Sequence, residues 1–244
     1  MTGRVGRCVI RVSVEVVEPP KLAVPWFARW VAESLPPGGS VLDIGAGEGL
    51  SGPLQRVRRR AAHITGVDPS PCVSLNRQLD EYHQMSLEEF GPSHRDHFDL
   101  AFSVFVLEHV AHPQEFARAC ASVLKPGGIV MGMTVNKWHY FGFTTWATTR
   151  LGISEWLLPR VRHDVLIERY HYPTEYRFNT VRTVSRLLAD AGFTAVEIRM
   201  WDLPEMYTPY LPAPAAGLAT AWHRLAYRLG RPQLMGHLTF KATL

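Results

Sequence analysis

Short apolar runs alternate with stretches of helical periodicity along most of the chain. The runs VLDIG, HITGVD, FDLAFSV and GIVMGMTV each fit one buried strand, and helices are expected in the segment to Arg60, at 72–82 and at 113–123. Two later strands, 194–201 and 235–244, each follow a predicted helix, at about 180–191 with Gly192 as its C-terminal cap and at about 215–229. Strands separated by helices indicate a parallel sheet with crossover connections. The pattern predicts an α/β fold whose doubly wound, mostly parallel sheet carries helices on both faces.

The composition is that of a chain with one core. Its 244 residues are 46% apolar, which favours a single domain. No run approaches the roughly 18 consecutive apolar residues of a membrane span. Residues 8–16 alternate between apolar and polar, whereas a signal peptide contains a continuous apolar stretch, so we expect a cytoplasmic protein. Three scattered cysteines, Cys8, Cys72 and Cys120, do not make a disulfide framework. The excess of 26 Lys and Arg over 22 Asp and Glu is too mild to indicate nucleic-acid binding.

A glycine-rich loop follows the first of these strands, in the sequence VLDIGAGEG. A strand that ends at Gly45 and leads through Gly47 and Gly49 into a helix exposes backbone N–H groups at the carboxyl edge of the sheet, where open α/β folds bind ligands. Glycine is needed there because a Cβ would block a close approach. Asp68 closes the next strand, where an acid can accept hydrogen bonds from both hydroxyls of a ribose. The loop therefore predicts a site for a nucleotide-like cofactor.

The spacing of the glycines decides between cofactors. The dinucleotide fingerprint G-x-G-x-x-G requires Gly or Ala at position 50, where this chain has Leu50, so a nicotinamide oxidoreductase is disfavoured. Asp43, inside the strand end, would sit badly beside a pyrophosphate but well beside the ammonium and sulfonium groups of S-adenosylmethionine. We therefore expect S-adenosylmethionine as the cofactor.

Four segments resemble the successive motifs of class I S-adenosylmethionine-dependent methyltransferases: VLDIGAGEG, GVDPS, FDLAFSVFVLEHV and VLKPGGIVMGMTVN. The resemblance covers residues 41–136, with a softer match over YPTEYRFNTVRTVSRLLADAGF, and it implies a Rossmann-like sheet of seven strands. It also implies that the glycine loop and its acid meet the methionine moiety, that the acid ending the second strand holds the ribose, and that the end of the fourth strand faces cofactor and substrate. The residues at these positions are Asp43, Gly45, Ala46, Gly47, Gly49, Asp68, Pro69, Phe105, Glu108 and His109.

The adenine position departs from the family pattern. Members commonly have an acid after the third strand that accepts a hydrogen bond from the adenine amino group, and here Ser86 stands at the aligned position. The alternatives are the hydroxyl of Ser86, the backbone of Leu87, or Glu88.

Methyl transfer to a hydroxyl requires proximity, orientation and a proton acceptor. His109 is the candidate base, because it follows Glu108 just past the fourth strand and imidazole can accept a proton near neutral pH. The alternative is that His109 only packs and bonds locally; lesser candidates are His112, His139, His171 and Tyr140. No metal is expected, since Glu108, His109 and Asn136 supply a single carboxylate. The basic run Arg56, Arg58, Arg59 and Arg60 is interpreted as a solvated helix face.

Aromatic residues gather in one stretch that breaks the alternation of strands and helices. Residues 137–179 are interpreted as an inserted, substrate-facing subregion, between a cofactor-binding core at 37–136 and the C-terminal part of the same domain at 180–244. Residues 1–36 are expected to form an N-terminal extension and a lid helix, whose Trp26, Phe27 and Trp30 could close the other side of the site. The rings of the subregion fit an aromatic or apolar ligand or, equally, a core; they are Trp138, Tyr140, Phe141, Phe143, Trp146 and Trp156.

These observations favour a methyltransferase that acts on a small aromatic or apolar molecule, more often on oxygen than on carbon or nitrogen. The alternative is a fold relative that binds S-adenosylmethionine without transferring its methyl group, as a sensor or as a catalyst of another reaction. The expected partner is a small molecule and not a nucleic acid, with no membrane span, while peripheral contact with a membrane and the oligomeric state stay open.

Overall fold

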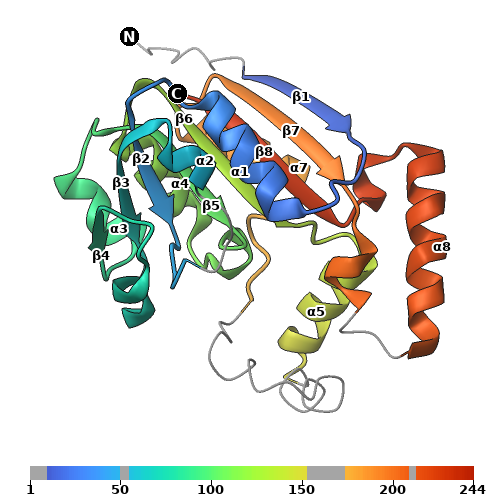
Figure 1. Cartoon of the computed structure of the whole chain (residues 1–244). Helices are drawn as coiled ribbons and strands as arrows, with labels where there is room; N and C mark the ends of the chain where they lie inside the picture. Colours follow the sequence, from blue (N-terminus) through green and yellow to red (C-terminus); the bar gives the residue numbers. More distant parts are fainter. Residues whose placement is uncertain (1–9, 50–54, 153–173, 209–212) are drawn as a thin grey trace, which may run out of the picture.

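The computed structural model describes residues 10–49, 55–152, 174–208 and 213–244 (Figure 1). They form one eight-stranded sheet in the order β1-β7-β8-β6-β5-β2-β3-β4. Every described pairing is parallel except those of β8, which runs antiparallel between β6 and β7. The strands are β1 (Arg11–Val16), β2 (Gly39–Ile44), β3 (Ala61–Val67), β4 (Glu81–His83), β5 (Phe98–Val104), β6 (Leu124–Val135), β7 (Ala195–Trp201) and β8 (His237–Thr243). The predicted α/β class and mostly parallel sheet are confirmed.

The sheet has eight strands rather than the seven expected. The additional strand is β1, which pairs in parallel with β7 from Arg11↔Ala195 to Val16↔Met200. Its sequence, RVSVEV, alternates apolar and polar residues, which is the period of a strand. The expectation that residues 1–36 form only an extension and a helix is therefore wrong for this segment, which is an edge strand of the sheet.

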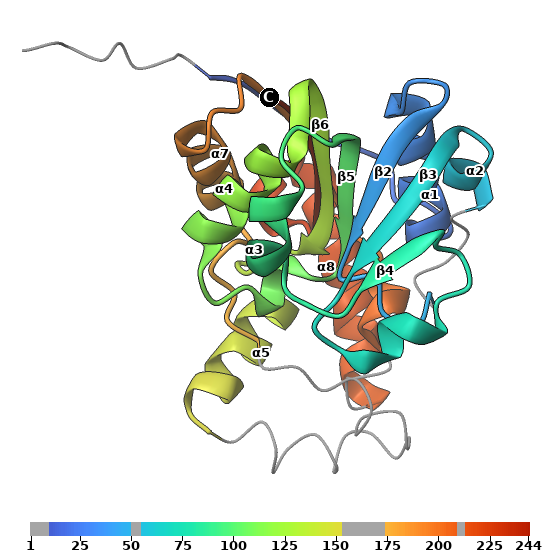
Figure 2. The same cartoon turned by 90° about the vertical axis from the view of Figure 1, so that its left-hand side faces the viewer.

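Helices cover both faces of the sheet (Figure 2). Buried residues of α1 and α2 pack on one face, and those of α3, α4 and α7 pack on the other. Helix α5 extends beyond the carboxyl edge of the parallel strands, and α8 stands beside the β7 and β8 end (Figure 1). The helices are α1 (Ala23–Ser34), α2 (Gln55–Arg58), α3 (Leu87–Phe90), α4 (Pro113–Val123), α5 (Tyr140–Arg150), α7 (Val181–Asp190) and α8 (Ala213–Leu229), with short 3₁₀ turns η1 (Pro71–Leu75), η2 (Gly91–Ser93), η3 (Leu107–His109), η5 (Pro204–Met206) and η7 (Pro232–Leu234).

Helix α1 belongs to the core through its aromatic residues. Phe27 and Trp30 are buried and join a cluster with residues of the central strands. Trp26 is partly buried and lies edge-on to Trp201, with ring centroids 6.0 Å apart, at the carboxyl end of β7. The two buried rings therefore stabilise the sheet, and a role as a lid stays a prediction for Trp26 alone.

One predicted helix is wrong. Residues 72–82 form no α-helix; the 3₁₀ turn η1 starts at Pro71, and β4 begins at Glu81. The side chains of the segment bond to nearby backbone, since Ser70 accepts from the amide of Cys72 at 3.3 Å and Asn76 from the amide of Gln78 at 3.0 Å. Ser and Asn compete with helical hydrogen bonds in this way.

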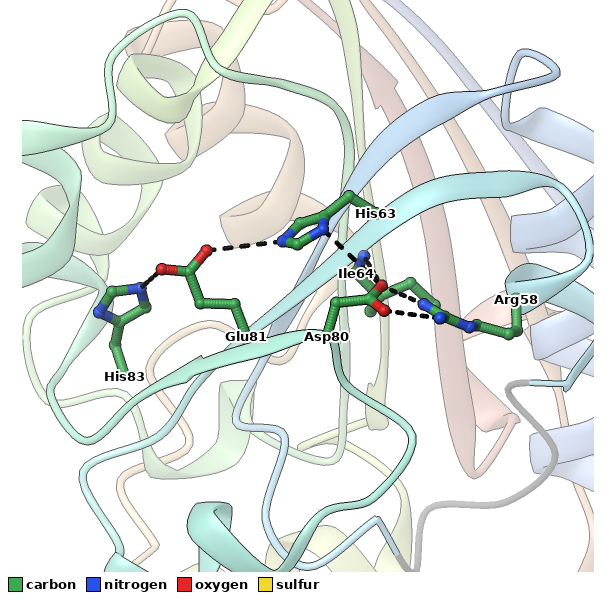
Figure 3. Close-up of polar contacts among 6 residues, drawn as sticks. All are labelled: Arg58, His63, Ile64, Asp80, Glu81 and His83. Carbon is green, nitrogen blue, oxygen red and sulfur yellow. Dashed lines mark hydrogen bonds and ion pairs between the residues drawn. The ribbon is translucent and has the colours of Figure 1, made fainter.

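Polar contacts fix the edge strand β4 to β3 (Figure 3). The guanidinium of Arg58 bonds both carboxylate oxygens of Asp80, which also accepts from the amide of Ile64 at 2.8 Å. On the neighbouring strand, Glu81 lies between His63 at 3.5 Å and His83 at 3.0 Å. Arg60 donates to the carbonyl of Leu35 at 3.0 Å. Arg58 and Arg60 are thus bound within the protein, which gives these two members of the basic run a structural role.

Candidate cofactor and methyl-transfer site

The glycine loop leaves β2 at the carboxyl edge of the sheet. Gly45, Gly47 and Gly49 have φ of 70°, 47° and 82°, a region that side chains with a Cβ disfavour. A Cβ on Gly45 would overlap Val106, and one on Gly49 would overlap the side chain of Asn76. Neighbouring side chains therefore leave room only for glycine at these two positions. A Cβ on Gly47 would meet nothing within 4 Å. The loop therefore has one open point, at Gly47, where a ligand can approach the backbone.

The carboxylate of Asp68 lies against this open point. One oxygen accepts from the amide of Gly47 at 2.9 Å and the other accepts from the amide of Ser70 at 2.8 Å. The fold thus brings together the glycine loop and the acid that ends β3, as the sequence predicts, with Pro69 exposed beside them. A carboxylate offers about four acceptor positions, so two backbone bonds leave capacity for ribose hydroxyls.

Asp43 is buried beneath the loop. Its side chain belongs to a residue only 6% exposed, and burial, with the charge of Asp68 adding to it, raises the pKa of its carboxyl to about 8. A buried acid that holds its proton to this pH would be ionised by a nearby cation. The ammonium group of S-adenosylmethionine supplies such a cation. The two carboxyl groups, of Asp43 and Asp68, and the open backbone at Gly47 therefore fit this cofactor.

We expect Asp43→Asn to stabilise the ligand-free protein at pH 8, with a gain that shrinks toward pH 4. In the folded state the wild-type carboxyl keeps its proton to about pH 8, against a usual pKa of 3.8. The folded state therefore binds more protons between these values, and wild-type stability is lost as pH rises through this window. The neutral amide removes this dependence, for a gain of several kcal/mol at pH 8. Urea unfolding at pH 4, 6 and 8 measures it.

Asp80→Asn is the matched control, because the hydrogen bond from Arg58 lowers the pKa of Asp80. A lowered pKa contributes stability above the usual value that is lost as pH falls. This variant should therefore lose stability at neutral pH and approach wild type in acid. A loss at pH 8 in both variants would show that Asp43 is ionised in the free protein.

The end of β5 carries a strained residue. Phe105 has a φ of 54°, which is uncommon for a residue with a side chain of this size. Residues with such strained backbone conformations cluster at functional sites. Its amide donates to the carbonyl of Met133 at 2.8 Å, and its ring is edge-on to His237 at 6.3 Å between centroids. Val106 packs against Gly45. The β5 end therefore adjoins the glycine loop, and its predicted contact with cofactor and substrate stays a prediction.

Glu108 and His109 form the turn η3 that follows. Glu108 is buried, accepts from the hydroxyl of Thr134 at 2.8 Å, and has a raised pKa because of burial, against the opposing charge of His109. Its backbone carbonyl accepts from the amides of Glu175 at 2.7 Å and Tyr176 at 3.1 Å. Glu108 therefore holds the returning segment at 174–180, and a contact with cofactor stays a prediction. His109 is half-buried.

The predicted adenine residues begin helix α3. The hydroxyl of Ser86 accepts from the amide of Glu89 at 3.3 Å, while the carboxylate of Glu89 accepts from the amide and hydroxyl of Ser86 at 2.8 and 2.9 Å. This reciprocal capping box engages the Ser86 side chain. Leu87, buried, is the first residue of the helix, where backbone amides have no partner inside the helix. The adenine contact itself, by Ser86, Leu87 or Glu88, stays a prediction.

Two residues that the sequence analysis missed hold the glycine loop in place. The amide group of Asn76 donates to the carbonyl of Ala46 at 3.0 Å, and that of Gln78 donates to the carbonyl of Gly49 at 2.9 Å. The mistaken helix at 72–82 concealed them. The pair Ser70-Pro71 is a turn signal that could have located the start of this segment.

A buried polar cluster, also missed, lies where β7 and β8 meet. Both oxygens of Asp202 are engaged, one by the hydroxyl of Tyr207 at 2.7 Å and one by His223 at 3.0 Å. His139 lies 3.6 Å from Asp202, and burial lowers the pKa of His139 to about 3, as it does for His237. His139 is therefore a neutral, buried member of this cluster. The remaining histidine candidates are separate: His112 lines a cavity described below, and His171, like Trp156, lies outside the described residues.

A cavity of about 820 Å³ opens beside η3, between the starts of α4 and α7. None of the predicted cofactor residues lines it. Among the described residues, no group of three His, Cys, Asp or Glu side chains is arranged to hold a metal ion, and no helix there is both long and apolar enough to cross a membrane.

The sheet order, the glycine loop and the acids at two neighbouring strand ends define a Rossmann-like α/β protein with a nucleotide-type site at its carboxyl edge. A family model described as "Methyltransferase domain" matches residues 21–198. The chain belongs to this family, and its class is that of the class I S-adenosylmethionine-dependent methyltransferases. The predicted family, enzyme class and cofactor are confirmed.

Individual relatives agree with this assignment. The chain is 32% identical over 172 residues to a ubiquinone biosynthesis O-methyltransferase of Aromatoleum aromaticum, covering 66% of this chain and 66% of that protein. It spans about half the length of other curated relatives with the same name, such as that of Sodalis glossinidius at 53%. Among solved structures it is similar to a SAM-dependent methyltransferase of Archaeoglobus fulgidus, with a TM-score of 0.60, 15% identity and coverage of 92% and 94% of the two chains. It is also similar to the [4+2]-cyclase SpnF, with a TM-score of 0.57, 22% identity and coverage of 98% and 88%.

Proposed function

We propose that this protein transfers the methyl group of S-adenosylmethionine to an oxygen atom of a small aromatic or apolar molecule. The observation that carries the proposal is the open backbone at Gly47, with Asp68 bonded to it and the buried Asp43 beneath it, at the carboxyl edge of a methyltransferase fold. The choice of oxygen is supported by the relatives named as O-methyltransferases of ubiquinone biosynthesis. The methyl-transfer activity and the kind of acceptor are proposed for this chain and are not carried over from those relatives.

The chain's residues divide the work of binding. Asp68 would hold the ribose, the amide of Leu87 would contact the adenine, and Asp43 would bind the ammonium group as a carboxylate after releasing its proton to solvent. When bound, the cofactor supplies a methyl group activated by the positive charge of its sulfonium. The protein adds proximity and orientation, and His109, past the strained end of β5, accepts the hydroxyl proton of the acceptor.

Aromatic side chains in α5 and just before it support an aromatic or apolar acceptor. Phe141 stacks on Tyr207 with centroids 5.4 Å apart, and Tyr140 lies edge-on to the same ring at 5.6 Å. Trp138 and Phe143 are 60% and 45% exposed, which is unusual for such large rings in a core. The inner rings stabilise the base of the subregion, and the exposed ones remain available to a ligand.

The proposal includes the setting of the reaction. The enzyme acts in the cytoplasm on a small molecule and has no nucleic-acid partner. The support is the sequence itself, whose mild positive charge and lack of long apolar runs carry these expectations.

Formation of S-adenosylhomocysteine tests the activity. The protein is incubated with S-adenosylmethionine and either catechol, phenol or benzene derivatives that lack the hydroxyl group. Product formation that requires both the hydroxyl and the protein supports O-methylation. Tight binding of S-adenosylhomocysteine with no turnover of any hydroxylated or amino acceptor would favour the non-methylating alternative. SpnF, a protein of similar fold, is named as a [4+2]-cyclase.

A further inference from the structure

The cavity beside η3 is strongly basic. Lys137, Arg177, Arg182 and Arg186 line it, and among the residues that the structure describes no Asp or Glu does. Glu175 pairs with Arg177 at 3.0 Å, which offsets one of the four charges. The remaining three cations still make this concave surface a favourable place for an anion, since a cleft focuses the field of the charges along its walls.

Two of these cations face each other along one helix. Arg182 and Arg186 stand four residues apart on α7, both exposed, and neither forms an ion pair with another described residue. Like charges at this spacing destabilise a helix. The helix therefore carries a small cost that an anion between the two guanidinium groups would remove, and Arg binds carboxylate and phosphate with two parallel hydrogen bonds.

The third cation, Lys137, enters the cavity from the end of β6. Its ammonium lies 4.3 Å from the ring centre of Trp146 and 5.7 Å from that of Trp138. Leu187 and Met200 add buried apolar wall to the same cavity. The cavity thus combines an apolar side with a cationic side, which suits a small molecule with an apolar body and an anionic group.

The cavity adjoins the proposed site of methyl transfer. Its wall includes Ala111 and His112, which follow His109 by two and three residues. Arg177 donates to the carbonyl of Ala111 at 3.1 Å, and the amide of Tyr176 donates to the carbonyl of Glu108 at 3.1 Å. The segment that brings Arg177 to the cavity is therefore bonded to the turn that carries His109.

We propose that this cavity binds an oxyanion, a carboxylate or phosphate group, that belongs to the methyl acceptor, with Arg182 and Arg186 as its principal partners and Lys137 beside them. The identity of the ligand as the acceptor rests on the proposed function, whereas the binding of an oxyanion does not. The inference narrows the acceptor to an anionic member of the aromatic or apolar class.

Calorimetry with phenyl phosphate tests the site on the full chain. Wild type should bind phenyl phosphate at least tenfold more tightly than neutral benzyl alcohol. The double variant Arg182→Gln/Arg186→Gln should bind phenyl phosphate at least tenfold more weakly than wild type. Its unfolding temperature should be at or above that of wild type, because a pair of like charges has been removed. Arg224→Gln/Arg228→Gln is the matched control, since these exposed arginines have the same spacing on α8, away from the cavity, and it should bind as wild type does.

The outcomes separate this inference from the proposed function. Equal affinity for the two probes, unchanged binding in the α7 variant, or an equal loss in the α8 control would overturn the oxyanion site. S-adenosylhomocysteine is titrated in parallel and should bind wild type and both variants alike. Failure of that titration in wild type would remove the proposed function and leave the phenyl phosphate result to stand by itself.

Discussion

Gly47→Val is expected to weaken S-adenosylhomocysteine binding at least a hundredfold. The wild-type position meets nothing within 4 Å of where a Cβ would stand, so a branched side chain would occupy the space by which a ligand reaches the backbone. It would also strain a residue whose φ is 47° and disturb the hydrogen bond from its amide to Asp68. Titration calorimetry measures the affinity, and circular dichroism with thermal unfolding measures the fold.

Gly127→Val separates the loss of space from backbone strain. Gly127 has φ of 76° and open space around a Cβ, but it lies at the start of β6, at the opposite edge of the sheet. Both variants should lose stability by about 1–2 kcal/mol, and only Gly47→Val should lose binding. If Gly47→Val retained affinity while unfolding as Gly127→Val does, the glycine would serve the loop conformation alone.

His109→Gln is expected to lower kcat by about 10²- to 10⁴-fold, the range of a positioned acid-base group, with unchanged affinity for S-adenosylhomocysteine. Raising the pH should partly rescue the variant, because a phenol that ionises in solution needs no base. The measurement is kcat against pH for both proteins at saturating cofactor.

His139→Gln is the comparison for this experiment. His139 is buried with Asp202 and Tyr207, so its loss should lower stability without changing the shape of the pH profile. A kcat of the His109 variant within threefold of wild type at every pH from 6 to 9 would mean that His109 only shapes the pocket and that orientation carries the reaction.

The elements with strong periodicity could be predicted closely. Strand β5 and helix α4 have the predicted bounds, and α7 begins after the capping residue Thr180 and ends before Gly192, whose φ is 105°. The glycine loop could be predicted as well, because φ values that only glycine adopts freely leave a direct mark on the sequence. Local patterns fail where long-range contacts decide the structure. Asn76 is a turn residue by propensity, and its use in holding the glycine loop depends on a partner 30 residues away.

The candidate site could be predicted from the sequence to about the same extent as the fold. Asp68 and Gly47 are adjacent because their strands are neighbours in a known kind of sheet, which the resemblance implies. The bonds of Glu108 to Thr134 and to the segment at 174–180 were not predictable, since they join parts of the chain that share no local pattern. The cations of the basic cavity come from two separate parts of the chain, Lys137 and residues 177–186, so their convergence is visible only in the fold.

The position of β8 has a consequence for synthesis of the chain. This strand is the last of the described sheet to leave the ribosome, yet it pairs with both β6 and β7. Until it arrives, those two strands expose unpaired backbone edges, and such edges are templates for aggregation. The nascent protein therefore passes through a stage with its sheet divided in two, and a chaperone that shields the β6 and β7 edges would act at that stage.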